Sequence, residues 1–309
     1  MRLLVLGAGG TGGYFGGRLA EAGVDVTFLV RPARAARLQA SGLRIRSPLG
    51  DADIPVQVVT ADALDDVAPF DLVLLSCKAY DLDSAMDAIA PAVAKGGAVL
   101  PLLNGLRHYD ALDARFGFAS VLGGLCFISA TLGSDGEILH LAKPASITFG
   151  ERVGQAPHPH LQALAAACAQ AGVDHAHTPD IAQAQWIKYS FLTALAAGTC
   201  AMRAPIGTIV AGEGGADFMA ALHDECLAVA AASGQPVPAV AQATARETLT
   251  AAGSPMKASM LRDLEAGQRV EAADIVGDMV HRAGLHGLAV PRLHTAWVHL
   301  QAYERLRTS

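Results

Sequence analysis

The chain has 309 residues, of which 52% are hydrophobic and 17% are charged, so it can form the cores of two domains and is not expected to be disordered. Its net charge of -6 excludes the basic surface of a nucleic-acid-binding protein, and no uninterrupted apolar stretch is long enough to span a membrane. The five cysteines are scattered without a CxxC pair, which indicates reduced thiols and a cytoplasmic protein without a disulfide framework.

The chain begins with the pattern of a strand, a glycine-rich turn and a helix. Residues 1–6 form an apolar run of strand length, and residues 13–20 are typical of a helix. The turn matches G-x-G-x-x-G, in which the glycines allow a tight turn, a close pyrophosphate and close packing of helix on strand. The helix N-terminus would bind the phosphates through its free N–H groups. A plain glycine-rich turn is the alternative, but the context favours a dinucleotide site formed by Gly7, Gly9, Gly10, Thr11 and Gly12.

The second predicted strand, residues 24–30, bears on the choice of cofactor. Sites for NAD usually end this strand with an acidic residue that binds the ribose 2′-hydroxyl, whereas a cation suits the 2′-phosphate of NADP. Arg31 stands at this end of the strand, and Arg34 and Arg37 follow it. We therefore predict NADPH as the cofactor, with Arg31 as a cofactor-binding residue. Arg34 and Arg37 can equally be solvated residues on the face of a helix.

Two polar residues follow predicted central strands. The apolar runs 71–76 and 98–103 are typical of buried parallel strands, and a helix is expected between them at 82–94. Lys78 comes after the first run and Asn104 after the second. Ligands of open parallel sheets bind at the carboxyl ends of the strands, so these two side chains could converge on one bound molecule. Taken singly, a surface lysine and a turn-forming asparagine are the simpler interpretations.

The remaining patterns separate the chain into two halves. Further strands are expected at 43–46, 54–59, 121–128, 137–141, 146–149 and 173–176, with the later ones continuing the sheet as antiparallel members, and a helix at 160–171. Strand signals stop near Pro179, where we predict a domain boundary. Beyond it, helices are expected at 181–200, 218–233, 237–252, 256–265, 270–283 and 291–306, punctuated by Gly/Pro segments, so the second half is predicted to be all-α.

Three polar residues stand out in this apolar helical half. Lys188 lies mid-helix among aromatic neighbours, and its alternative role is to extend from an apolar face to water. Glu271 begins a helix, where the helix dipole favours a carboxylate, and Ser259 can be an ordinary helix serine. None of the 11 histidines has the spacing of a metal ligand set, so no metal site is predicted.

The order and spacing of these residues resemble the ketopantoate (2-dehydropantoate) reductase family over nearly the whole chain. Besides the glycine pattern, the resemblance rests on Cys77-Lys78-Ala79, Leu103-Asn104-Gly105, Trp186-Ile187-Lys188, Ala204-Pro205-Ile206-Gly207, the segment 259–264, and Glu271 with Ile275 and Gly277. It implies an α/β Rossmann N-terminal domain over residues 1–178 and an all-α C-terminal domain over residues 179–309. The second domain would be similar to that of 6-phosphogluconate dehydrogenase, and a cleft would separate the two.

The resemblance also implies an activity, namely NADPH-dependent reduction of 2-dehydropantoate, a 2-oxo acid, to the corresponding 2-hydroxy acid in pantothenate biosynthesis. Lys188 corresponds to the catalytic lysine, and Glu271 to a carboxylate near that lysine and the cofactor. Asn104 corresponds to the strand-end asparagine and Lys78 to a cation near cofactor or substrate. Substrate binding would fall to Asn104, Lys188 and Ser259. Hydride transfer to a ketone leaves an alkoxide, which a lysine can stabilise and protonate.

Four positions depart from the family pattern. Where polar amides are often seen, this chain has Leu192, Ala196, Ile206 and Met256. An apolar pocket discriminates less than one that hydrogen-bonds a hydroxyl, so the sequence supports the reductase class without fixing the substrate. A reductase of a more apolar carbonyl compound and a catalytically silent NADPH-binding sensor are the competing hypotheses. The expected partners are a small 2-oxo acid and, for a homodimer, a second copy through the helical domain, with neither nucleic acid nor membrane.

Overall fold

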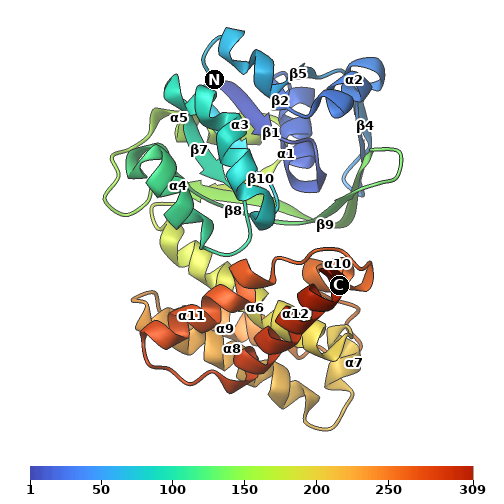
Figure 1. Ribbon diagram of the computed structural model, residues 1–309, viewed down its shortest axis with the longest axis vertical. Coiled ribbons are helices and arrows are strands. Elements are labelled where there is room, and N and C mark those ends of the chain that lie inside the picture. Colours follow the sequence, from blue (N-terminus) through green and yellow to red (C-terminus); the bar gives the residue numbers. More distant parts are fainter. Residues whose placement is uncertain (309) are drawn as a thin grey trace. The chain divides into compact units, whose positions relative to one another are not determined.

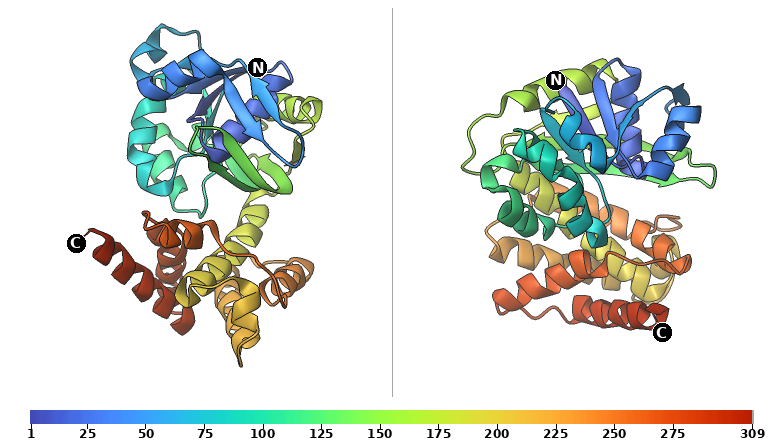
Figure 2. Two further views of the ribbon diagram at one scale, coloured as in Figure 1. Left: turned by 90° about the vertical axis from the view of Figure 1, so that its right-hand side faces the viewer. Right: turned by 45° about the horizontal axis from the view of Figure 1, so that its top comes forward.

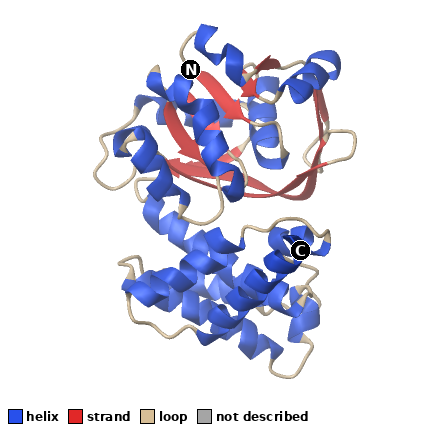
Figure 3. Ribbon diagram, in the orientation of Figure 1, coloured by secondary structure: helices blue, strands red, loops and turns tan. Residues whose placement is uncertain are grey.

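The computed structural model describes residues 1–308, which divide into two compact units (Figure 1). The first unit contains Met1–Leu103 and His108–Ile181, and the second contains Asn104–Arg107 and the chain from Ala182 onward. Every strand of the described residues belongs to the first unit, and the second is built from helices (Figure 3). An α/β domain followed by an all-α domain is therefore confirmed.

A five-stranded parallel sheet forms the centre of the first unit. Its strands lie in the order β5-β2-β1-β6-β7, with bounds Gln57–Val59, Asp25–Leu29, Arg2–Leu6, Leu72–Leu75 and Ala98–Pro101. The strands β6 and β7 are buried along their whole length, as a sheet covered on both faces requires. The strand order reverses beside β1, and in such doubly wound folds ligands bind at the carboxyl ends of the strands there. The predicted Rossmann sheet is confirmed.

Helices and 3₁₀ turns connect the strands of the first unit. The α-helices are α1 (Gly10–Glu21), α2 (Pro32–Ser41), α3 (Leu82–Ala94), α4 (His108–Phe116) and α5 (Pro159–Gln170). The 3₁₀ turns span Ala61–Asp66, Ala79–Asp81 and Phe118–Ser120. Proline at the first helical position of α2 and α5 suits a helix start, because no intrahelical partner exists for the missing N–H there.

A second, mixed sheet accompanies the first. Its order is β10-β9-β3-β4, with β8 also paired to β9, and the bounds are Asp174–His177, Ile138–Gly150, Leu43–Arg46, Ala52–Ile54 and Gly123–Leu132. The long β8–β9 ribbon, green in Figure 2, is antiparallel, whereas β10 pairs with β9 in parallel. Its link to the parallel sheet among the described residues is an isolated bridge between Val99 and Val121.

Three strand predictions were wrong in detail. The run 54–59 is two strands, because Pro55 interrupts it and β4 and β5 pair into different sheets. The runs 137–141 and 146–149 are one strand, β9, which continues through Pro144. A register shift leaves residues 141–144 without partners in β8, and such a bulge tolerates a proline. The later strands therefore form a second sheet instead of continuing the first.

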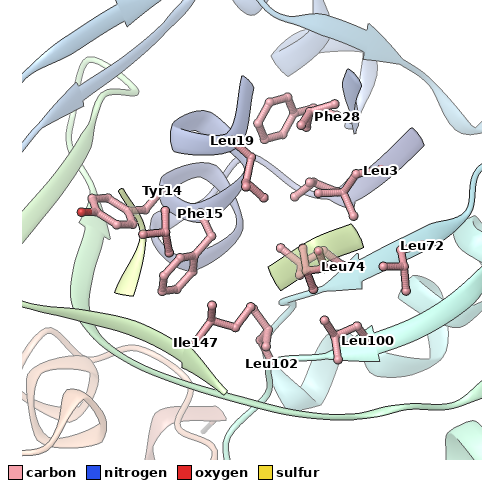
Figure 4. Packing of buried hydrophobic residues seen from close by; sticks show 14 of the residues in the cluster. Leu3, Tyr14, Phe15, Leu19, Phe28, Leu72, Leu74, Leu100, Leu102 and Ile147 are labelled. Atoms are coloured by element: carbon pink, nitrogen blue, oxygen red, sulfur yellow. The ribbon is translucent and has the colours of Figure 1, made fainter. Parts of the chain in front are cut away.

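Helix α1 lies between the two sheets, and its glycines allow both to come close. A Cβ on Gly16 would lie 3.0 Å from the Phe28 ring of β2, and one on Gly17 would lie 2.8 Å from Ile45 Cδ1 of β3. Figure 4 shows side chains of this cluster, among them Leu3, Tyr14, Phe15, Leu19, Phe28, Leu74 and Ile147. Close packing against both sheets therefore holds helix α1 in place directly after the glycine turn.

The second unit is a helical cluster around its own apolar core. Its helices are α6 (Ile181–Met202), α7 (Ile206–Val210), α8 (Gly215–Ala232), α9 (Ala239–Leu249), α10 (Ser259–Glu265), α11 (Asp278–Leu285) and α12 (Pro291–Thr308). The helix expected at 270–283 instead begins with a π-helical turn, Ala273–Gly277. Within residues 1–308, no helix combines the length and the hydropathy that crossing a membrane requires.

Candidate functional site

The glycine turn between β1 and α1 has the geometry of a phosphate-binding loop. Gly7 has φ +82°, a conformation that side chains disfavour, and its N–H donates to the Leu29 carbonyl at 2.8 Å. A Cβ on Gly9 would meet no atom within 4 Å, so the space beside this residue is open. A Cβ on Gly12, in contrast, would overlap Ser76 Oγ and lie 3.2 Å from Val5 Cγ1. Gly9 thus allows a ligand to approach the backbone from outside, whereas Gly12 allows α1 to pack closely on β1.

The start of α1 adds N–H groups to this loop. Gly9 is the N-cap, and no side chain caps the helix. Gly10 and Thr11 are the first two helical residues and are half-buried. Uncapped N–H groups and the positive end of the helix dipole suit an anion, and the open space at Gly9 is where a pyrophosphate would enter. These residues fit a bound dinucleotide.

The three arginines after β2 differ in their surroundings. Arg31 is the N-cap residue of α2, two residues beyond the end of β2, and its side chain is exposed, as is that of Arg37. Arg34 is half-buried and donates through Nη2 to the carbonyls of Ala8, at 3.2 Å, and Gly136, at 2.8 Å. Burial lowers the pKa of Arg34, and the charges of neighbouring arginines lower it further. Arg34 is therefore not merely a solvated residue of the helix face.

A second constellation lies in the helical unit. Lys188, on α6, is only 8% exposed, and its Nζ donates to Asn104 Oδ1 at 3.0 Å. A buried ammonium is costly unless it is hydrogen-bonded, and the amide oxygen provides such a partner. The structure therefore brings together two of the predicted site residues, 84 positions apart in the sequence. The alternative role of Lys188, extension to water from an apolar face, does not agree with this burial.

The segment that carries Asn104 is attached to the helical unit although it follows β7. Gly105, with φ +79°, lies so close to the Asp274 carbonyl that a Cβ would overlap it. Leu106 packs on the helical core, and Arg107 Nη1 lies 3.7 Å from Asp274 Oδ1. Lys78, half-buried after β6, belongs to the first unit, so its convergence with Asn104 stays a prediction.

Acidic residues surround the π-helical turn. Glu271, only 5% exposed, precedes the turn by two residues, and Asp274 lies inside it. Burial raises the pKa of the Asp274 carboxyl; Arg107 opposes this, and the charges of Glu271 and Asp278 add to it. π-turns inside helices occur frequently at functional sites, and this one begins beside the proposed catalytic carboxylate.

A buried network next to Lys188 was missed by the sequence analysis. The Tyr189 hydroxyl, on α6, lies 3.0 Å from the Ile275 carbonyl and 2.8 Å from Asp278 Oδ2, and Arg282 Nε donates to the same carboxylate oxygen at 2.8 Å. Burial raises the pKa of Tyr189 well above its usual value, and Asp278 adds to the shift. The network joins α6 to the π-turn. Its sequence signal, an Asp-x-x-x-Arg pair after Glu271, gave no indication of the tyrosine.

The positions that depart from the family pattern are not equivalent in the structure. Ala196 and Ile206 have no exposed surface and belong to the helical core. Leu192 is half-buried, one helical turn beyond Lys188 and on the same face of α6, while Met256 is 40% exposed. Ser259 is half-buried at the start of α10. Leu192 is therefore the departure that lies beside the Lys188–Asn104 pair, and an amide at Ala196 or Ile206 would be enclosed.

No cluster of three potential metal ligands occurs among the described residues.

A Rossmann sheet with an open glycine loop, followed by a helical domain with a buried lysine–asparagine pair, defines a class of dinucleotide-dependent oxidoreductases. Residues 3–154 match the family described as "Ketopantoate reductase PanE/ApbA", and residues 180–304 match "Ketopantoate reductase PanE/ApbA C terminal". The chain therefore belongs to the ketopantoate reductase family and is an oxidoreductase.

Individual relatives agree with this assignment. The chain is 37% identical to the uncharacterized oxidoreductase YkpB of Bacillus subtilis, over 98% of this chain and 99% of the relative. It is 30% identical to a 2-dehydropantoate 2-reductase of Halobacterium salinarum, over 96% of each chain. The crystal structure of a 2-dehydropantoate 2-reductase from Geobacter metallireducens superimposes with a TM-score of 0.88 at 30% identity, covering 98% of this chain and 99% of that one.

Proposed function

We propose that the protein reduces a 2-oxo acid to a 2-hydroxy acid with NADPH, and that 2-dehydropantoate, in pantothenate biosynthesis, is the first candidate substrate. The observation that carries the proposal is the hydrogen bond of 3.0 Å between the buried Lys188 ammonium and Asn104. The family assignment and the relatives described as 2-dehydropantoate 2-reductases support the choice of substrate.

Lys188 acts on the oxygen of the substrate carbonyl. Its ammonium donates a hydrogen bond to this oxygen, stabilises the negative charge that develops there, and then transfers a proton to it. Asn104 holds the ammonium in place through its amide oxygen. Glu271, buried beside the π-turn, is the carboxylate that would hold the ammonium in position.

The dinucleotide binds the glycine loop and the start of α1, and when bound its reduced nicotinamide supplies the hydride. Arg31 at the end of β2 interacts with the 2′-phosphate, and no carboxylate stands at this position to bind a free 2′-hydroxyl. Lys78 contributes a second cation toward cofactor or substrate. The choice of NADPH over NADH thus depends on one exposed guanidinium.

A reductase of a more apolar 2-oxo acid is the second candidate. Leu192, one helical turn from Lys188, favours it, since a leucine offers no partner for the hydroxyl group of 2-dehydropantoate. Ser259 at the start of α10 is the residue that would bind this hydroxyl if 2-dehydropantoate is the substrate.

Steady-state kinetics on the full chain test the proposal. NADPH oxidation is measured with a panel of 2-oxo acids that includes 2-dehydropantoate and its analogue without the hydroxyl group. We expect 2-oxo-acid-dependent turnover that falls at least about 100-fold in Lys188→Met, the lower range for general acid catalysis. It should be retained in Lys95→Met, whose ammonium binds the Val67 carbonyl at 3.3 Å in the first unit. A higher kcat/KM for the analogue would favour the second candidate. No turnover with any 2-oxo acid, while NADPH binds, would favour the sensor hypothesis.

We also propose a homodimer, which light scattering on the same preparation tests: a molar mass of twice the 31.8 kDa chain supports it, and that of a single chain contradicts it.

A further inference from the structure

The β8–β9 ribbon of the second sheet contacts the dinucleotide loop of the first. A Cβ on Gly10, at the start of α1, would lie 2.7 Å from the Ala130 carbonyl of β8. Where the ribbon reverses direction, between Leu132 and Ile138, the Gly136 carbonyl accepts a hydrogen bond from Arg34 at 2.8 Å. The ribbon therefore contacts the start of α1 at Ala130, and its reversal contacts Arg34 of α2.

Arg34 connects this reversal to the loop itself. The same Nη2 that binds Gly136 lies 3.2 Å from the carbonyl oxygen of Ala8, which stands between Gly7 and Gly9. The peptide from Ala8 to Gly9 is planar and trans, so its C=O and N–H point in opposite directions. By holding the Ala8 carbonyl on one side, Arg34 directs the Gly9 N–H toward the other.

Two further arginines and a glycine lie around the Arg34 guanidinium. Burial lowers the pKa of Arg34, and the nearby charges of Arg37 and Arg44 lower it further. The Arg44 guanidinium donates to the Asp135 carbonyl in the same reversal at 2.9 Å. Gly136 has φ +75°, and a Cβ there would lie 2.5 Å from Arg34 Nη1 and 2.8 Å from Arg37 Nη1. The glycine leaves the space that the Arg34 side chain fills.

We propose that Arg34 is a positioning residue for the dinucleotide loop. By hydrogen-bonding both the Ala8 carbonyl and the Gly136 carbonyl, it holds the loop against the β8–β9 reversal, and it does not bind the 2′-phosphate. The proposal rests on the proposed function, because it requires a nicotinamide dinucleotide at this loop. It separates the arginines that follow β2 into two roles. Arg31 distinguishes NADPH from NADH, whereas Arg34 serves both cofactors equally.

The test compares the dissociation constants of NADPH and NADH, measured by fluorescence titration well below the melting temperature of each variant. In Arg34→Gln both constants should rise by the same factor, about fivefold, as expected for the loss of one intramolecular hydrogen bond, and their ratio should stay constant. Arg34→Lys keeps the charge but not the planar fork, and should recover affinity only in part. Arg44→Gln removes a neighbouring cation that does not contact the loop, and should change neither constant.

Gly136→Ala tests the role of Arg34 from the β8–β9 reversal, without removing a charge. Its Cβ displaces the Arg34 guanidinium, so both constants should again rise together. Gly154→Ala is the matched control, since Gly154 has φ +90° with nothing within 4 Å and bears the same backbone strain. It should bind both cofactors normally.

Three results would overturn the proposal. A selective loss of NADPH affinity in Arg34→Gln would make Arg34 a ligand of the 2′-phosphate. A lower melting temperature with both constants unchanged would assign it to fold stability alone. Failure of the unmodified protein to bind either dinucleotide would overturn the proposed function, and this proposal with it.

Discussion

Gly9→Ala should weaken cofactor binding without unfolding the protein. Gly9 has φ -87° and ψ -168°, which alanine adopts freely, and its added Cβ would meet nothing within 4 Å. Alanine is a poorer N-cap than glycine by roughly 0.5–1 kcal/mol. It also restricts the unfolded chain, which favours folding by roughly 0.4–1 kcal/mol. The two effects nearly cancel, so the free energy of unfolding should hardly change.

The cofactor should behave differently. The new methyl group occupies the space through which a pyrophosphate approaches the loop, and one lost hydrogen bond to a charged group is worth about 1.5–3 kcal/mol. The dissociation constant for NADPH should therefore rise roughly 10- to 100-fold. Gly12→Ala is the contrasting variant, because its Cβ overlaps Ser76 Oγ, and overpacking typically costs about 1–3 kcal/mol of stability. Thermal unfolding and fluorescence titration distinguish the two. Unchanged NADPH affinity in Gly9→Ala would refute the assignment of this loop.

Three further variants test separate parts of the account. Arg31→Ala should weaken NADPH by far more than NADH in titrations, and equal affinities of the unmodified protein for both would contradict our choice of cofactor. Leu192→Asn should raise kcat/KM for 2-dehydropantoate relative to its analogue without the hydroxyl; an unchanged ratio would remove Leu192 from the substrate pocket. Tyr189→Phe removes the buried hydroxyl donor from the Ile275 carbonyl and the Asp278 carboxylate. Urea unfolding should show a free energy of unfolding lower by about 1–3 kcal/mol, and an unchanged value would mean that solvent replaces the hydroxyl.

The sequence predicts the parts of this protein that depend on local patterns. The glycine loop and the buried strands β6 and β7 are of this kind, because turn geometry and continuous apolar runs are written in neighbouring residues. Local patterns do not predict the division of residues 54–59 between two sheets, since strand pairing is decided by partners elsewhere in the chain. They also do not predict that β9 continues through Pro144, because a proline indicates a break in a strand unless it lies at a bulge.

The candidate site shows the same limit. The positions of Lys188, Asn104 and Glu271 single them out in the sequence, and the resemblance supplies their roles. Neither indicates that the lysine and the asparagine are hydrogen-bonded. That contact depends on the segment 104–107, which follows a strand of one unit and packs with the other. The role of Arg34 was equally open, because an arginine on a helix face gives no sign of a carbonyl partner 102 positions away.

The most direct measurement of the central claim is the transfer of a label. The full chain is incubated with a 2-oxo acid and NADPH that carries deuterium in the transferable position, and the product is analysed by mass spectrometry. The account predicts a 2-hydroxy acid with one deuterium on its second carbon, formed by the unmodified protein and at least about 100-fold more slowly by Lys188→Met, the lower range for general acid catalysis. Undiminished product formation by Lys188→Met, or a product without the label, would contradict it.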